Sequence, residues 1–169
     1  MARLPLPATT SADPMARSVL AHLPESLAAF QQLYAVLWQD GALDPVTKEI
    51  ARMRNARVTD CGYCRNVRFD GPRRAGLTEA VLDLVADGYE ESTLSARHRA
   101  VLRFTDVFLT DPTALGVPAR EALLAELAPR EIVALAAALA LFMGFSKIAV
   151  ALGTAPASMP LTVLPTPRI

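Results

Sequence analysis

The chain has 169 residues, and 17 basic residues balance 17 acidic ones, so its formal net charge is zero. This length suits one compact domain with a substantial buried core. The charge balance gives no overall field that would draw the protein to nucleic acid or to an anionic membrane, so we expect neither as a partner.

The two ends of the chain are richest in proline. Residues 1–17 contain Pro5, Pro7 and Pro14 but no apolar run that could form the core of a signal peptide, so we expect a flexible segment and a cytoplasmic protein. Residues 154–169 hold four further prolines. We expect this second segment to be an extended tail that either lies over a neighbouring subunit or is disordered.

The central part of the chain, 18–153, carries repeated helix start and stop signals, whereas alternating strand patterns and hairpin turn signals are missing. The sequence predicts an all-α domain of about six or seven helices. In the second of them, Asp44 is the expected N-cap and Pro45 the first helical residue. The predicted helices span 24–38, 45–57, 61–70, 78–86, 95–109, 118–127 and 129–152.

Residues 132–145 form the most apolar stretch of the chain. Their 14 residues are short for a membrane span, and Ser146 and Lys147 follow at once, so we interpret the stretch as a buried core helix. Because it is apolar on every face, a domain of this size needs neighbouring subunits to cover it. We therefore expect a homo-oligomer.

The only two cysteines, Cys61 and Cys64, lie three residues apart. In a reducing compartment, such a pair suits redox chemistry or metal binding better than a structural cross-link. We expect both at the start of the helix over 61–70, where unpaired backbone N–H groups favour the thiolate. Arg65 and Arg68 each follow one cysteine by four residues, so each is expected to share the helical face of its cysteine.

Other interpretations of the pair remain open at this point. A zinc site would need two more ligands, and the only histidines, His22 and His98, are neither paired nor suitably spaced. The two cysteines could also be inert core residues. In a third interpretation the protein is not an enzyme, and the disulfide switches its assembly or the arginines hold an anion.

Glu49 is the one acidic residue of the helix that precedes the cysteines. If the helices over 45–57 and 61–70 run antiparallel about the turn between them, Glu49 faces Arg68. Two interpretations follow. Glu49 is either an ordinary ion-paired or solvated acid, or a carboxylate placed beside the sulfur of Cys64.

Two strings resemble the carboxymuconolactone decarboxylase superfamily, and specifically its AhpD-like alkylhydroperoxidase branch. They are Lys-Glu-Ile-Ala at 48–51 and Cys-Gly-Tyr-Cys-Arg-Asn-Val-Arg at 61–68. The likeness extends from about Leu23 to Phe-Met-Gly-Phe-Ser-Lys at 142–147. The resemblance implies an AhpD-like helical subunit that assembles as a trimer or hexamer. The decarboxylases of the family resemble this chain in fold more than in a cysteine pair, which makes their activity the weaker expectation.

The resemblance also implies a peroxidase that reduces hydroperoxides through a dithiol, which becomes a disulfide. Cys64 matches the cysteine that attacks the peroxide, and Cys61 matches the cysteine that resolves the sulfenic acid. Glu49 stands twelve residues before Cys61, as the glutamate of the family does. An external dithiol, in some members a lipoylated protein, restores the pair, and no cofactor or metal is implied.

One position departs from the pattern of the family. The family places a histidine four residues after its second cysteine, where this chain has Arg68. An arginine cannot act as a general base at neutral pH, so we expect a weakened proton relay in which Arg68 holds the thiolate or an anionic substrate. Arg65 is expected to support the same site. Tyr63 could contribute a hydroxyl, although a packing or surface role is the simpler interpretation.

Overall fold

The computed structural model describes residues 3–8, 17–153 and 159–169. Within these ranges the chain forms eight α-helices, three short 3-10 helices and one sheet of two strands. The prediction of a helical protein is therefore confirmed, but the prediction did not include the small sheet. Parts of the predicted end segments, 1–2, 9–16 and 154–158, lie outside the described residues.

The five long helices lie close to their predicted positions. Asp44 caps its helix with a carboxylate that accepts the backbone N–H of Thr47 at 2.8 Å, and the Ser95 side chain caps another helix in the same way. Four of the five have proline within their first two positions. They are α1 (Pro24–Gln39), α2 (Pro45–Val58), α6 (Ala96–Thr110), α7 (Val117–Glu126) and α8 (Pro129–Ala151).

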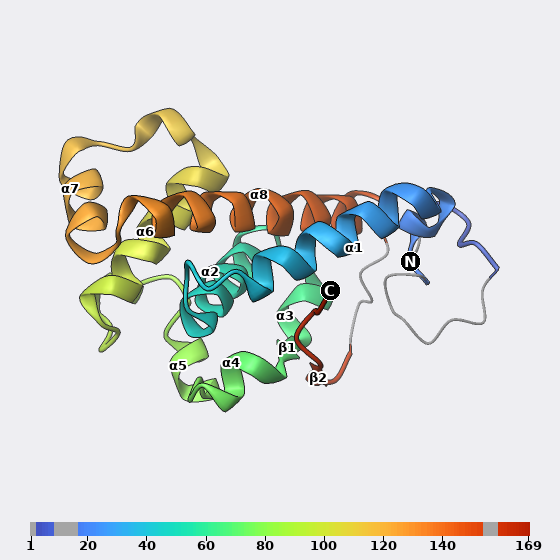
Figure 1. Cartoon of the computed structure of the whole chain (residues 1–169), viewed down its shortest axis with the longest axis horizontal. Helices are drawn as coiled ribbons and strands as arrows, with labels where there is room; N and C mark the ends of the chain where they lie inside the picture. Colours follow the sequence, from blue (N-terminus) through green and yellow to red (C-terminus); the bar gives the residue numbers. More distant parts are fainter. Residues whose placement is uncertain (1–2, 9–16, 154–158) are drawn as a thin grey trace.

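The longest helix, α8, runs beside α1 (Figure 1). By length and composition alone α8 is long and apolar enough to cross a membrane. In this structure it packs against α1, α2 and α6, and it buries Leu135, Leu139 and Phe142. Its role here is that of a core helix, as the sequence indicated.

The remaining elements are short. The 3-10 helices are η1 (Val19–His22), η2 (Tyr89–Glu91) and η3 (Pro112–Ala114). The short α-helices are α3 (Gly62–Asn66), α4 (Asp70–Arg74) and α5 (Glu79–Asp83). The strands are β1 (Val67–Phe69) and β2 (Thr162–Leu164).

The predicted helix over 61–70 is wrong in its second half. The helix α3 ends at Asn66, and the chain then extends as β1 before it turns into α4. All three residues of β1 are buried, and β1 pairs in parallel with β2, so that Val67 lies opposite Thr162. Val67 and Phe69 suit a strand. The partner strand lies 95 residues further along the sequence, so no local pattern indicates the pairing.

The C-terminal segment 159–169 is extended, as predicted, but it folds back onto its own chain. Besides the pairing of β1 with β2, the Asp70 carboxylate accepts both the N–H and the hydroxyl of Thr166 at 2.8 Å. Thr166 Oγ1 also accepts the N–H of Gly71 at 2.8 Å. A Cβ at position 71 would lie 2.6 Å from that oxygen, so the contact requires glycine. Figure 1 shows the segment beside α3 and β1.

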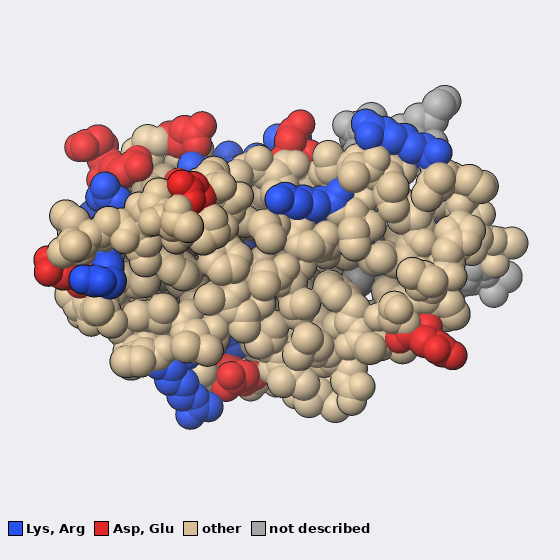
Figure 2. All heavy atoms as spheres, turned by 90° about the horizontal axis from the view of Figure 1, so that it is seen from above, with Lys and Arg blue, Asp and Glu red and all other residues tan. Residues whose placement is uncertain are grey.

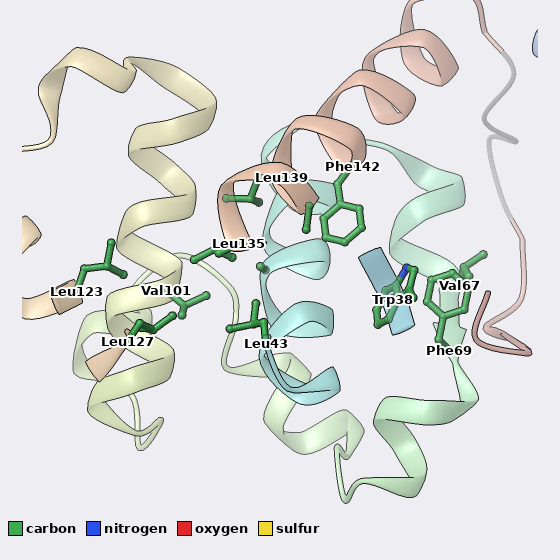
Figure 3. Packing of buried hydrophobic residues seen from close by; sticks show 12 residues of the cluster. Trp38, Leu43, Val67, Phe69, Val101, Leu123, Leu127, Leu135, Leu139 and Phe142 are labelled. Atoms are coloured by element: carbon green, nitrogen blue, oxygen red, sulfur yellow. The ribbon is translucent and has the colours of Figure 1, made fainter. Parts of the chain in front are cut away.

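The largest hydrophobic cluster fixes β1 against the long helices. It joins Trp38 of α1 and Phe142 of α8 to Val67 and Phe69 of β1 (Figure 3). The rings of Trp38 and Phe69 meet edge to face, with their centroids 4.9 Å apart. Such aromatic contacts are worth about 1 kcal/mol beyond their buried area. They hold in place the segment that directly follows the cysteine pair.

Candidate functional site

Cys61 and Cys64 are joined by a disulfide, with their Cα atoms 5.2 Å apart. Cys61 is the N-cap of α3, and its Sγ accepts the backbone N–H of Cys64 at 3.2 Å. Both cysteines therefore lie at a helix start, as the sequence predicted, although α3 has only five residues. Cys61 is 0% exposed, whereas Cys64 is 6% exposed and lines a cavity. Of the two sulfur-bearing residues, Cys64 is the one that a small molecule can reach.

A cavity of about 480 Å³ lies against Cys64. Six of the described lining residues are aromatic, and they come from α1, α3, β1 and α8. The aromatic lining residues are Phe30, Tyr34, Tyr63, Phe69, Phe142 and Phe145. A volume of this size is within the range of small-molecule sites, and the lining suits an apolar ligand.

Two buried polar side chains connect α2 and α8 to the sulfur of Cys64. Ser146 Oγ lies 3.3 Å from Cys64 Sγ, and Asn55 Nδ2 donates to Ser146 Oγ at 2.9 Å. Because Asn55 occupies one lone pair of the Ser146 oxygen, the hydroxyl hydrogen of Ser146 is free to point at the sulfur. A thiolate at Cys64 would receive this hydrogen bond, which favours the charged form.

Glu49 forms a buried ion pair with Arg52 of its own helix. Nε and Nη2 of Arg52 donate to the two carboxylate oxygens at 2.7 and 2.6 Å. Arg52 also donates to the carbonyl of Cys64 at 3.0 Å and to the carbonyl of Val67 at 2.6 Å. Burial lowers the pKa of Arg52, but the charge and the hydrogen bonds of Glu49, together with Tyr34 and Tyr63, outweigh burial. The pKa of Arg52 is therefore raised, and the guanidinium stays charged. Glu49 is thus connected to Cys64 through Arg52.

The predicted contact between Glu49 and Arg68 is wrong. Arg68 donates to both carboxylate oxygens of Glu79 at 2.9 to 3.1 Å. The cause is the extended backbone of β1, which removes the helical alignment that would have placed Arg68 behind Cys64. Arg68 is 8% exposed and occupied by a carboxylate, so it does not present a free cation to the cavity.

The other two supporting residues predicted from the sequence lie in different settings. Arg65 has a side chain that is 47% exposed and forms an ion pair with Asp60 at 3.0 Å, on the surface rather than behind a sulfur. Tyr63 lines the cavity, and its ring meets the ring of Phe145 with the centroids 6.3 Å apart. The ring of Tyr63 thus packs against α8 beside the cavity.

Sequence reasoning did not assign Arg52, Asn55 or Ser146 to the site. Arg52 and Asn55 follow Glu49 at steps of three residues, which places all three along one side of α2. That spacing was the available signal on α2. On α8 the signal was Ser146, a hydroxyl at the end of an apolar stretch, which needs a partner when it is buried.

Tyr34 of α1 also lines the cavity. Burial raises the pKa of Tyr34 to about 12, so its phenol stays protonated and can donate a hydrogen bond at neutral pH. Within the described ranges, no group of three or more His, Cys, Asp or Glu residues is placed to hold a metal ion.

The fold and the site define a helical protein in which a Cys-x-x-Cys dithiol or disulfide pair lies against an aromatic cavity. The sequence model of the carboxymuconolactone decarboxylase family matches residues 24–107. The chain belongs to this family.

Solved structures confirm that the fold is AhpD-like. A peroxidase-related protein from Ralstonia eutropha JMP134, described as an alkylhydroperoxidase AhpD core, superposes with a TM-score of 0.73 at 23% identity over 93% of each chain. A peroxidase-related protein from Silicibacter sp. TM1040 gives 0.71 at 19% identity over 90% of each chain. At these identities the likeness shows the fold alone.

The chain is also similar to an uncharacterized protein of Mycobacterium tuberculosis, with 30% identity over 92 residues. The match covers 54% of this chain but only 32% of the mycobacterial protein. The chain thus matches about a third of the length of that relative.

Proposed function

We propose that the protein is a thiol-dependent peroxidase that reduces organic hydroperoxides with Cys61 and Cys64. The observation that carries the proposal is the position of Cys64, whose sulfur lies between an aromatic cavity, the Ser146 hydroxyl and the sulfur of Cys61. Two findings support the same class of reaction. The chain matches the carboxymuconolactone decarboxylase family, and its fold resembles that of a protein described as an alkylhydroperoxidase core.

The reaction would begin with the reduced pair. The Cys64 thiolate attacks the terminal oxygen of the hydroperoxide, the O–O bond breaks, and the alkoxide takes up a proton and leaves as an alcohol. Cys64 is now a sulfenic acid. Cys61 attacks the Cys64 sulfur, which forms the disulfide and releases water. An external dithiol, such as a lipoylated protein, then supplies two electrons and two protons to restore both thiols.

The proposal gives each nearby side chain one task. Ser146 donates to the thiolate of Cys64, and the Tyr34 phenol is placed to donate a hydrogen bond to the departing alkoxide. Glu49 acts as a positioning residue, because both of its oxygens accept from Arg52, which in turn holds the carbonyl of Cys64. The weakened proton relay expected from the sequence would then be replaced by hydroxyl donors.

The proposal is tested by stopped-flow oxidation of the reduced protein with cumene hydroperoxide. We expect the wild type to lose two thiols for each hydroperoxide and to form the Cys61–Cys64 disulfide, identified by mass spectrometry. Cys61→Ser should react once and stop at a sulfenic acid that dimedone traps. Cys64→Ser should show no fast phase.

Two outcomes would contradict the proposal. One is oxidation of Cys64→Ser at the wild-type rate, which would move the attacking group elsewhere. The other is a wild-type rate no faster than that of free dithiothreitol, which would favour a redox switch without catalysis. Steady-state turnover with a dithiol reductant separates the enzyme from such a switch in the same samples.

A further inference from the structure

The C-terminal segment 159–169 forms one wall of the cavity. The segment lines the cavity with Leu164, Pro165, Pro167 and Arg168, and the other described lining residues come from the helices and from β1. The wall is attached at several points, namely the pairing of β2 with β1 and the hydrogen bonds of Thr166. The segment is therefore a built part of the site.

Among the described residues, two cations line the cavity, and they differ in whether a carboxylate neutralises them. The guanidinium of Arg52 is buried, and Glu49 neutralises it with two short hydrogen bonds. Arg168 is exposed. Among the described residues, none forms an ion pair or a hydrogen bond with its side chain. The described lining residues include no Asp or Glu. The described part of the cavity lining therefore carries one uncompensated positive charge, at the exposed Arg168.

We infer that the site takes molecules with an apolar body and an anionic group, and that Arg168 binds the anion. A guanidinium matches a carboxylate with two parallel N–H···O bonds, while the aromatic walls receive the apolar part. Because Arg168 is exposed and Cys64 is nearly buried, a molecule held at Arg168 extends inward toward the sulfur. The anion contact that the sequence suggested for Arg68 is thus assigned to Arg168.

The preferred substrates are accordingly organic hydroperoxides that carry a carboxylate. This statement about turnover rests on the proposed peroxidase function, whereas the binding of an anionic aromatic molecule does not. A contact remote from the reacting oxygen improves kcat/KM when it holds the peroxide in a reactive position. The two statements can be tested separately because the disulfide form binds ligands but cannot reduce a peroxide.

Binding is tested by calorimetry on the disulfide form with two probes of the same shape, para-isopropylbenzoate and para-isopropylbenzamide. We expect the benzoate to bind about tenfold more tightly, a difference of about 1.4 kcal/mol. Arg168→Gln should remove most of this preference. Arg120→Gln, which removes the same charge from an exposed position on α7, should keep it.

Turnover is tested on the reduced protein with cumene hydroperoxide and its para-carboxylate. Arg168→Gln should lower the ratio of kcat/KM for the para-carboxylate to kcat/KM for cumene hydroperoxide about tenfold. Arg120→Gln should leave this ratio unchanged. A wild type without a preference for the benzoate, or a preference that survives Arg168→Gln, overturns the inference. If no hydroperoxide is reduced while the benzoate preference still depends on Arg168, the anion site stands and the peroxidase proposal fails.

Discussion

Ser146 lies in an apolar helix, and its hydroxyl is held between the amide of Asn55 and the sulfur of Cys64. A sulfur in a disulfide is a weak acceptor, whereas a thiolate is a charged acceptor that strengthens the bond. The hydroxyl therefore interacts more favourably with the reduced, ionised site than with the oxidised one. Such a difference between states affects reactivity more than it affects folding.

We predict that Ser146→Ala raises the pKa of the Cys64 thiol and slows its oxidation at neutral pH by about tenfold. The physical reason is the loss of one hydrogen bond to a charged group, worth about 1.5–3 kcal/mol. The thiolate absorbance is followed as a function of pH, and the oxidation rate is measured by stopped flow. Thr105→Val is the matched control, because Thr105 is a buried hydroxyl that bonds a carbonyl within α6. Equal thiol titrations in the two variants would count against the role of Ser146.

Glu49 and Glu79 allow a comparison of a buried ion pair with a partly exposed one. We predict that Glu49→Gln lowers the free energy of unfolding by about 3 kcal/mol, because Arg52 is left buried without its counter-ion. Glu79→Gln should cost about 1 kcal/mol although Arg68 is buried, since the side chain of Glu79 is 41% exposed and water can replace its carboxylate beside Arg68. Urea denaturation measures both. Similar losses of the free energy of unfolding in the two variants would show that another group compensates the charge of Arg52.

The sequence offered Cys61, Cys64 and Glu49 as candidate site residues because their spacing along the chain is itself a signal. It could not assign their partners. Ser146 meets Asn55 across 91 residues, and this contact depends on how α8 packs on α2. Contacts of this kind follow from the tertiary fold and not from spacing along one helix.

Among the elements, the long helices were predictable because four of them have proline within their first two positions and the fifth, α6, has a serine cap. The short strand β1 was not predictable. The sequence Val67-Arg68-Phe69 is too brief for an alternating pattern, and its partner β2 lies in a proline-rich segment that reads as irregular. The presence of this strand changes which residues lie at the site. The strand turned Arg68 toward Glu79 and brought the C-terminal segment to the cavity.

We predict that the attachment of the C-terminal segment at Asp70 depends on pH only in acid. The backbone N–H of Thr166, together with Arg74 and the Thr166 hydroxyl, holds the pKa of Asp70 well below its usual range. A carboxyl with a lowered folded pKa stabilises the attachment fully above its unfolded pKa of about 3.9, and this contribution is lost as the pH falls through the folded pKa.

Hydrogen exchange at the amide of Thr166, corrected for the intrinsic rate, measures this attachment. Protection should stay constant from about pH 7 to about pH 4 and fall in stronger acid. Asp70→Asn should reduce protection at every pH. Asp111→Asn removes a similar carboxylate from a distant turn and should have no effect on Thr166. Loss of protection near neutral pH in the wild type would contradict the assignment.

At the scale of the whole molecule, α1 and α8 expose apolar side chains on neighbouring helices. They are Leu33 at 49%, Val36 at 41%, Val133 at 69% and Ile148 at 37% exposure. Figure 2 looks onto the side along which α8 runs in Figure 1, and it shows isolated charges on a largely uncharged surface. The homo-oligomer expected from the sequence therefore remains our proposal, with this face as the contact.

We predict that Val133→Lys shifts the protein to a smaller species in sedimentation velocity, because a charge in an apolar contact is costly to bury. Val117→Lys is the matched control, since Val117 is 54% exposed on α7, at a different part of the molecule. The same sedimentation coefficient for Val133→Lys and the wild type would place the contact elsewhere.

The parallel pairing of β1 with β2 also has a consequence for the time course of biosynthesis. At about 5–20 residues per second, a ribosome makes Arg168 roughly 5–20 s after Cys64, because 104 residues separate the two positions. During that interval the nascent thiols exist without the outer wall of their cavity, and oxidants of either charge can meet them. Selection by charge would thus arise only after Arg168 has been made, and until then the thiols would depend on external reductants.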